Sequence, residues 1–162
     1  MPIIIGSSYS PIYSVSSTLS PAAANRVHLA LMNNSSSRIA VIAVSYNGIL
    51  TATVTGYPLG IYLVRTSSVS GGSTVSIVKL DSTYPDVQNI IAYITPTLNN
   101  TLGIIDVTAI NVEDAGGITG MVKNYGNDSY KIIVNPGEGI ALVQYGVSGV
   151  GLIGLTIFFE VI

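Results

Sequence analysis

Charged residues are scarce in this chain, which has six basic and eight acidic side chains among 162 residues. At 9 % charged, it holds far fewer ionisable groups than the roughly 25 % of an ordinary globular domain. The basic residues are spread singly along the chain, whereas a groove that follows a phosphate backbone needs clustered lysine or arginine. The sequence therefore predicts no nucleic-acid partner.

Cysteine and tryptophan are absent, and there is a single histidine. Without cysteine, the chain has neither disulfides nor thiolate metal sites. His28 lacks the placed nucleophile and carboxylate of a catalytic triad, so we expect it on the outward face of a strand. The carboxylates at Glu113-Asp114, and at Asp81 with Asp86, do not match the ligand spacing of a calcium loop. We therefore expect no enzyme activity and no cofactor or metal.

Long uninterrupted apolar runs are also missing. Met1-Pro-Ile-Ile-Ile-Gly6 lacks the basic start and the long apolar core of a signal peptide. Residues 39–64 and 139–159 carry no charge, but Asn47-Gly48, Pro58 and several glycines interrupt them, unlike a membrane-spanning helix. Both stretches predict buried strands joined by turns, with Asn47-Gly48 as a two-residue hairpin turn. We expect no membrane partner.

Strand patterns fill most of the sequence. Val27, Leu29 and Leu31 alternate with Arg26 and His28, which predicts a half-buried strand, and residues 38–46 are apolar on both faces, as in a central strand. Further strands are predicted at 59–66, 74–80, 89–95, 103–112, 129–134, 139–145 and 150–161, with a flexible loop at 67–73 and a tight turn at 135–139. About eight to ten strands at this spacing predict an all-β fold, a jelly-roll-like or Greek-key β-sandwich with little or no helix.

The expected organisation is one β-sandwich domain over residues 21–162, preceded by residues 1–20 as an extended arm or a first strand. Gly149-Val-Gly-Leu-Ile-Gly154 has the spacing of a dinucleotide-binding motif, which requires a helix immediately after it. Leu155-Thr-Ile-Phe-Phe159 follows instead, and its β-branched and aromatic residues predict a strand. Asp106 lies within Ile104-Ile-Asp-Val107, on the opposite face of the predicted strand from Ile105 and Val107. We expect that face to meet water or a donor from a partner.

So few charges cannot cover the surface, so serine, threonine, asparagine, tyrosine and apolar groups must do so. Exposed apolar patches and unblocked sheet edges recruit other chains. We therefore expect a homo-oligomer, with a trimer favoured, and with assembly contacts at Ile3, Ile4, Ile5, Tyr9 and Tyr13. The ten tyrosines also suit a protein interface or a carbohydrate platform.

Three segments together carry a resemblance: VRTSSVSGGSTVSIVKLDS (64–82), NPGEGIAL (135–142) and LTIFFEV (155–161). Their combination resembles small β-sandwich structural proteins of the virions of tailed bacteriophages. The resemblance implies a head decoration, or cement, protein that is made in the host cytoplasm and stabilises the outer capsid surface, often as a trimer. Its partners would be copies of itself and the major capsid protein or another virion protein. The family offers no catalytic residue.

Two other functions stay open. The tyrosines and the loops rich in asparagine, serine and glycine also fit a carbohydrate- or receptor-binding module of a tail fibre. The very low charge departs from the family and leaves open a self-assembling coat or extracellular filament subunit.

Overall fold

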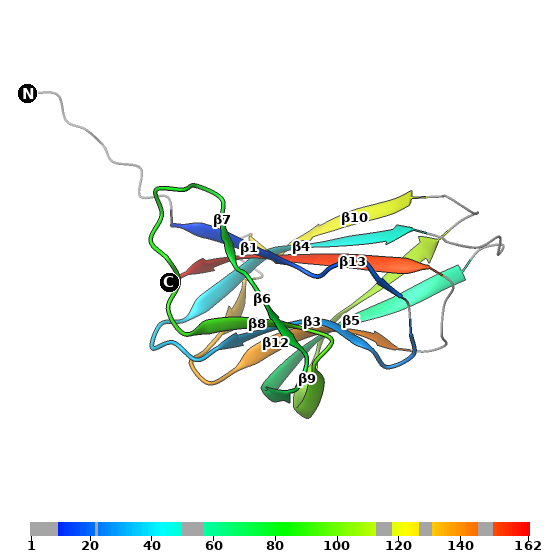
Figure 1. Cartoon of the computed structure of the whole chain (residues 1–162), viewed down its shortest axis with the longest axis horizontal. Coiled ribbons are helices and arrows are strands. Elements are labelled where there is room, and N and C mark those ends of the chain that lie inside the picture. Colours follow the sequence, from blue (N-terminus) through cyan, green and yellow to red (C-terminus); the bar gives the residue numbers. More distant parts are fainter. Residues whose placement is uncertain (1–9, 22, 50–56, 113–117, 127–130, 146–150) are drawn as a thin grey trace, which may run out of the picture.

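The computed structural model describes residues 10–21, 23–49, 57–112, 118–126, 131–145 and 151–162, which form two antiparallel sheets packed face to face (Figure 1). These residues contain no helix, so the predicted all-β sandwich is confirmed. The strands are β1 (Ile12–Ser16), β2 (Ser20–Pro21), β3 (Val27–Asn33), β4 (Ile39–Ile49), β5 (Tyr57–Ser70), β6 (Ser73–Val75), β7 (Val78–Lys79), β8 (Ile90–Ile94), β9 (Thr97–Val112), β10 (Ile118–Asn124), β11 (Ile132–Val134), β12 (Gly139–Tyr145) and β13 (Leu152–Val161). Their number exceeds the expected one because several short strands lie at the margins of the sheets.

The order of the strands interleaves distant parts of the chain. One sheet runs β10-β4-β13-β1-β7, with β11 also paired to β4 and β2 to β13. The other runs β6-β8-β3-β12-β5-β9. β12 lies between β3 and β5, and β13 lies between β4 and β1. The C-terminal strands therefore complete the middle of both sheets, which makes the fold depend on pairing between residues far apart in sequence.

The core fills the space between the sheets with large side chains from both inner faces. Tyr13, Tyr46 and Phe159 are the bulkiest fully buried residues, and the ring of Tyr13 stacks on that of Phe159 with centroids 5.6 Å apart. Aliphatic residues of β3, β4, β5, β12 and β13 surround them. Burial of a large apolar side chain contributes about 1.5–3 kcal/mol, so this layer is the main source of stability.

The strand at Val27–Asn33 is buried on both faces, so the prediction that it is half-buried was wrong. All seven residues of β3 are buried. On its outer face, Val27 and Ala30 belong to a second apolar cluster, against which Val69 and Leu98 pack. These two residues lie where β5 and β9 pair through repeated register shifts, and β-bulges bend a strand pair. The bent end of the β5–β9 pair therefore covers the outer face of β3, which the alternation of apolar and polar residues had predicted to face solvent.

Asn47-Gly48 was predicted as a turn but lies within β4. Asn47 faces Gly120 of β10 on one side and Gly154 of β13 on the other. A Cβ atom built on Gly120 would approach Asn47 Oδ1 to 3.1 Å. Gly120 thus leaves room for the Asn47 side chain. Asn-Gly favours a turn in isolation, but pairing with strands on both sides keeps it extended here.

The predicted turn at 135–139 is confirmed, whereas the predicted loop at 67–73 was wrong. Gly137 has a φ of 83°, and the Glu138 amide donates to the Asn135 carbonyl at 3.0 Å. In contrast, β5 continues to Ser70, and the chain turns only at Gly71 and Gly72, which both have positive φ. β10 was not predicted at all, because Ile118–Asn124 lacks a clear alternation.

Candidate interaction surface

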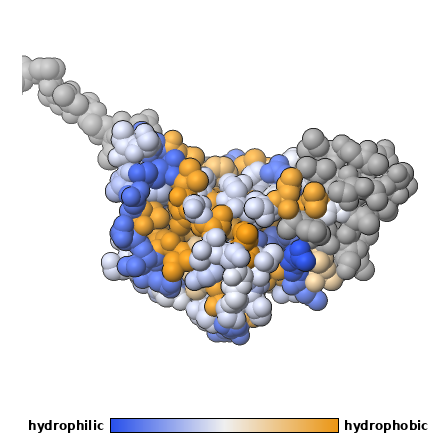
Figure 2. Space-filling view, in the orientation of Figure 1, coloured by the Kyte–Doolittle hydropathy of each residue, from blue (hydrophilic) through white to orange (hydrophobic). Residues whose placement is uncertain are grey.

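The two open edges of the sandwich are built very differently. At one edge the sheets end in β6 and β7, which have three and two residues. The connecting segment 73–90 crosses in front of the gap between the sheets (Figure 1). Figure 2 shows hydrophilic residues along its outer margin, with apolar residues just inside them. Such short edge strands leave little backbone free to pair with another chain.

Side-chain contacts help to fix this connecting segment, together with the pairing of β7 with β1 and of β6 with β8. The Tyr13 hydroxyl donates to the Pro85 carbonyl at 2.9 Å, and Lys79 Nζ lies 2.9 Å from Asp86 Oδ1. The sequence prediction placed Tyr13 at an assembly contact. Tyr13 is only 2 % exposed, so its ring contributes to the core of its own chain. Ile3, Ile4, Ile5 and Tyr9 lie outside the described residues.

The opposite edge is long and apolar. Here the sheets end in β9, with sixteen residues, and β10, with seven. We call these two strands the β9–β10 edge. Half of the ten exposed large apolar side chains found among the described residues lie on it: Leu102, Ile104, Val107, Met121 and Val122. An exposed, long and apolar edge strand is a typical site of pairing with another chain.

A polar cluster joins the two strands of this edge. Asp106 Oδ2 accepts hydrogen bonds from Lys123 Nζ at 3.0 Å and from the Tyr125 hydroxyl at 2.6 Å. Its Oδ1 accepts from the Val107 amide at 2.7 Å. Asp106 is the one charged residue within β9, and its charge is paired inside the chain. We expected this face to meet water or a partner's donor; 29 % of the Asp106 side chain is exposed, and it also has donors within the chain, from β10 and the residue beyond it.

The electrostatics of the cluster follow from these bonds. Partial burial works to raise the pKa of Asp106, but the hydrogen bonds from Tyr125 and Lys123 outweigh it and hold that pKa below its ordinary value. Burial, together with the hydrogen bond to Asp106, raises the pKa of Tyr125. Asp106 therefore stays ionised, Tyr125 stays protonated, and the β9–β10 edge offers no unpaired carboxylate that would repel an approaching copy.

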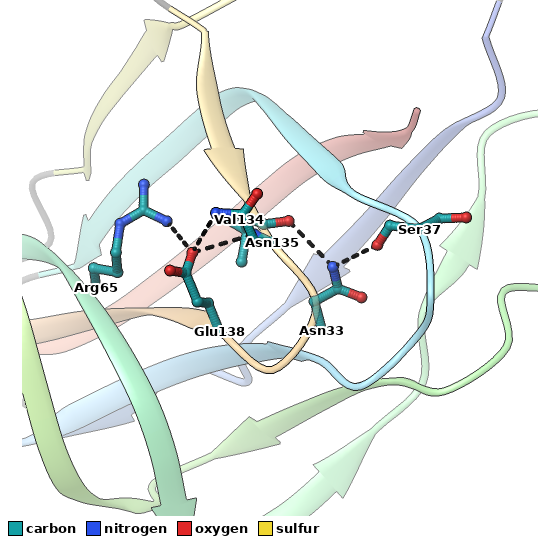
Figure 3. Close-up of polar contacts among 6 residues, drawn as sticks. All are labelled: Asn33, Ser37, Arg65, Val134, Asn135 and Glu138. Carbon is teal, nitrogen blue, oxygen red and sulfur yellow. Dashed lines mark hydrogen bonds and ion pairs between the residues drawn. The ribbon is translucent and has the colours of Figure 1, made fainter.

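A second polar network braces one end of the sandwich (Figure 3). Arg65 Nη1 donates to Glu138 Oε2 at 2.6 Å, and the Asn135 amide donates to the same oxygen at 3.2 Å. The Asn135 amide lowers the pKa of Glu138, partial burial opposes this, and the Arg65 charge adds to the lowering. These bonds join the 135–139 turn to β5, and a structural role accounts for all of them.

Asn33 extends this bracing to the turn between β3 and β4. Its Nδ2 donates to the Ser37 carbonyl at 2.8 Å and to the Val134 carbonyl at 3.1 Å (Figure 3). Its Oδ1 accepts from the Ser35 amide at 3.2 Å and from the Ser35 hydroxyl at 2.6 Å. Asn33 is fully buried, and one amide side chain thus holds two turns together.

His28 is buried, so the prediction that it lies on the outward face of a strand was wrong. Its Nε2 lies 3.1 Å from Gln144 Oε1. Burial lowers the pKa of His28, although the hydrogen bond with Gln144 opposes this shift. The register of β3 with β12 shifts at this point, since Leu142 pairs with Leu29 but Val143 pairs with Val27, and His28 therefore lies beside Gln144 instead of facing solvent. The pair links β3 to β12 within the sheet.

Asp81 and Asp86 do not converge. Asp81 Oδ1 accepts from the Thr83 amide at 2.8 Å, whereas Asp86 pairs with Lys79. Within the described ranges, no group of three or more histidine, cysteine, aspartate or glutamate residues lies close enough to hold a metal ion. Glu113 and Asp114 fall outside those ranges. No helix of the described chain is long and apolar enough to span a membrane.

The surface that sequence reasoning missed is the β9–β10 edge. Alternation predicted a strand over 103–112, but it carries no information about which strand ends a sheet. Comparison of the chain with protein-family models, with curated proteins and with solved structures finds no match.

Proposed function

We propose that this chain is a non-enzymatic structural protein that assembles with copies of itself and stabilises the outer surface of a viral capsid. The β9–β10 edge supports the assembly part of the proposal. It is long and apolar, and its single β9 charge is already paired, whereas the opposite edge is short and crossed by residues 73–90. Because the described strands form one such edge, the chain has a defined direction in which to recruit a partner.

A second copy is the partner that this edge fits best. Among the described strands β9 pairs with β5 alone. Its outer side offers backbone donors and acceptors for antiparallel pairing, except at Val107, whose amide donates to Asp106 Oδ1 and whose carbonyl accepts from Lys123 Nζ. Antiparallel pairing of β9 with β9 of another copy is self-complementary, as a two-fold interface requires. The stretch from Thr97 to Ile105 carries no charge, so two copies meet without electrostatic repulsion. Each aliphatic side chain that becomes fully buried contributes about 1.5–3 kcal/mol.

The assembly part is tested by light scattering on the purified chain and two single variants. Ile104 is 55 % exposed on β9, and Val78 is 56 % exposed on β7, so the two positions are matched in exposure but lie on opposite edges. We expect an oligomer for the wild type and for Val78→Lys, and a shift to monomer for Ile104→Lys. A monomeric wild type, or equal disruption by both variants, contradicts the proposal.

The virion part is supported by the resemblance of residues 64–82, 135–142 and 155–161. These segments form most of β5–β7, the 135–139 turn with the start of β12, and the end of β13. An antibody against the purified chain, used for immunogold labelling of particles from the source culture, tests it. Gold on the outer surface of viral heads supports capsid decoration. Gold restricted to tail fibres or to filaments contradicts it and favours one of the two alternatives.

A further inference from the structure

A second surface feature lies on the outer face of the sheet that contains β3, β12 and β9. A groove of about 850 Å³ separates the loop 23–26 from the turn between β8 and β9, with the end of β12 as its floor. Its lining combines apolar and hydroxyl or amide side chains: Ala23, Ala24, Asn25, Arg26, Val27, Thr95, Pro96, Thr97, Leu98, Thr101, Val143 and Tyr145. This volume falls within the range of about 300–1,000 Å³ that is usual for small-molecule sites.

An aromatic ring lies at the floor of the groove and is fixed in place. Tyr145 is 38 % exposed, although it is the last residue of a strand that is otherwise buried. Its ring stacks on that of Tyr62 in β5, with centroids 4.5 Å apart and an angle of 29° between the planes. One face of Tyr145 is therefore supported by Tyr62, so the ring holds a set orientation. An aromatic face with a polar tip suits a ligand that is partly apolar and partly hydroxylated.

Each rim of the groove contains a residue other than glycine at positive φ. Asn25 on one rim has a φ of 58°, and Thr95 on the other has a φ of 50°. A β-branched residue at positive φ is a genuine outlier, and such strain persists only where the surroundings impose it. On the first rim, the Ala23 amide donates to Gln144 Oε1 at 3.0 Å and the Gln144 amide donates to the Arg26 carbonyl at 2.8 Å.

The chemistry of the lining narrows the class of ligand. Threonine hydroxyls at 95, 97 and 101 and the Asn25 amide provide uncharged hydrogen-bonding groups around the Tyr145 ring. Among the described residues of the lining none is a carboxylate, and Arg26 is the single charged one. A neutral sugar presents the matching surfaces, with C–H groups on the face of its ring and hydroxyls around its rim. We infer that this groove binds a neutral glycan, with a sugar ring stacked on Tyr145.

Thr97, Leu98 and Thr101 belong both to the groove and to β9, whereas Tyr145 and Ala24 lie outside the β9–β10 edge. Substitutions at Tyr145 and Ala24 therefore test the groove without altering the edge. Binding is measured on an array of neutral and acidic oligosaccharides, and then by calorimetry with the best neutral hit. We expect Tyr145→Ala to weaken binding by roughly tenfold or more, consistent with the loss of about 1.4 kcal/mol. Tyr145→Phe keeps the ring and should bind within about threefold of the wild type, since it retains the stacking surface. Tyr84→Ala, in the connecting segment 73–90, is the matched control and should bind as the wild type does.

A variant at the rim guards against loss of folding in Tyr145→Ala. Ala24 is exposed, so Ala24→Trp adds bulk to the groove without disturbing the core, and it should abolish binding while the melting temperature stays unchanged. Failure of every neutral glycan to bind overturns the inference. So does retention of full affinity by Tyr145→Ala and Ala24→Trp, or a preference for acidic glycans that survives both substitutions.

Discussion

Asn33 is a single side chain whose loss should weaken the fold measurably. Asn33→Ala removes four hydrogen bonds, two donated by Nδ2 and two accepted by Oδ1. The Ser37 carbonyl keeps a second donor, the Ser35 hydroxyl at 3.1 Å, so this carbonyl stays hydrogen-bonded in the variant. The Val134 carbonyl, on a fully buried residue, loses this donor. A net hydrogen bond is worth about 0.5–1.5 kcal/mol and an unsatisfied buried group costs about 1–3 kcal/mol, so we expect a loss of about 2–4 kcal/mol.

Urea denaturation followed by circular dichroism measures this loss. Asn34→Ala is the matched control, since Asn34 is the exposed neighbour of Asn33 in the same turn, and a surface substitution should stay within about 0.5 kcal/mol of the wild type. Asn33→Asp keeps an acceptor but replaces the amide donor that faces two carbonyls, so it should destabilise at least as much as alanine. Equal stabilities for Asn33→Ala and Asn34→Ala would refute the account of the brace.

Two further predictions concern pH. The pKa of His28 in the folded chain lies below its ordinary value of 6.5, so the unfolded chain binds the proton more readily and stability should fall as the pH drops below about 6.5. His28→Gln should show a smaller loss between pH 7.5 and 5.5 in urea titrations; an identical loss would contradict the burial argument. The pKa of Asp106 is lowered from 3.8, so its contribution is present above that pH and disappears as the pH falls through the folded value. Asp106→Asn should therefore lower the free energy of unfolding by about 1 kcal/mol at pH 7. In strong acid the variant and the wild type should be equally stable. Melting temperatures at pH 7 and pH 2.5 will check both expectations.

Local signals in the sequence predicted the local structure well. The 135–139 turn follows from Pro136 and Gly137, since proline presets the first turn position and glycine supplies the positive φ. β12 was predicted with its observed bounds, because residues 139–145 form an apolar run with a turn signal directly before it. A turn or an apolar run is determined by a few neighbouring residues, so it can be predicted without knowledge of the rest of the fold.

Properties set by distant neighbours could not be predicted in the same way. His28 was placed outside because nothing near it in sequence shows that the register of β3 with β12 shifts there and sets it beside Gln144. Asn47-Gly48 favours a turn locally, yet pairing with β10 and β13 extends it. The β9–β10 edge depends on strand order, and Asp106 meets Lys123 and Tyr125 only because two sheets end side by side. Alternation along one strand contains none of this.

The most direct test of the central claim is hydrogen exchange of the full chain at increasing protein concentration, read by mass spectrometry. If copies assemble through the β9–β10 edge, the amides of β9 on the side away from β5 should gain protection as the oligomer forms, because they pair with another strand. Peptides from the connecting segment 73–90 should exchange at the same rate at every concentration. Protection that grows in residues 73–90 while β9 stays unchanged would contradict the account.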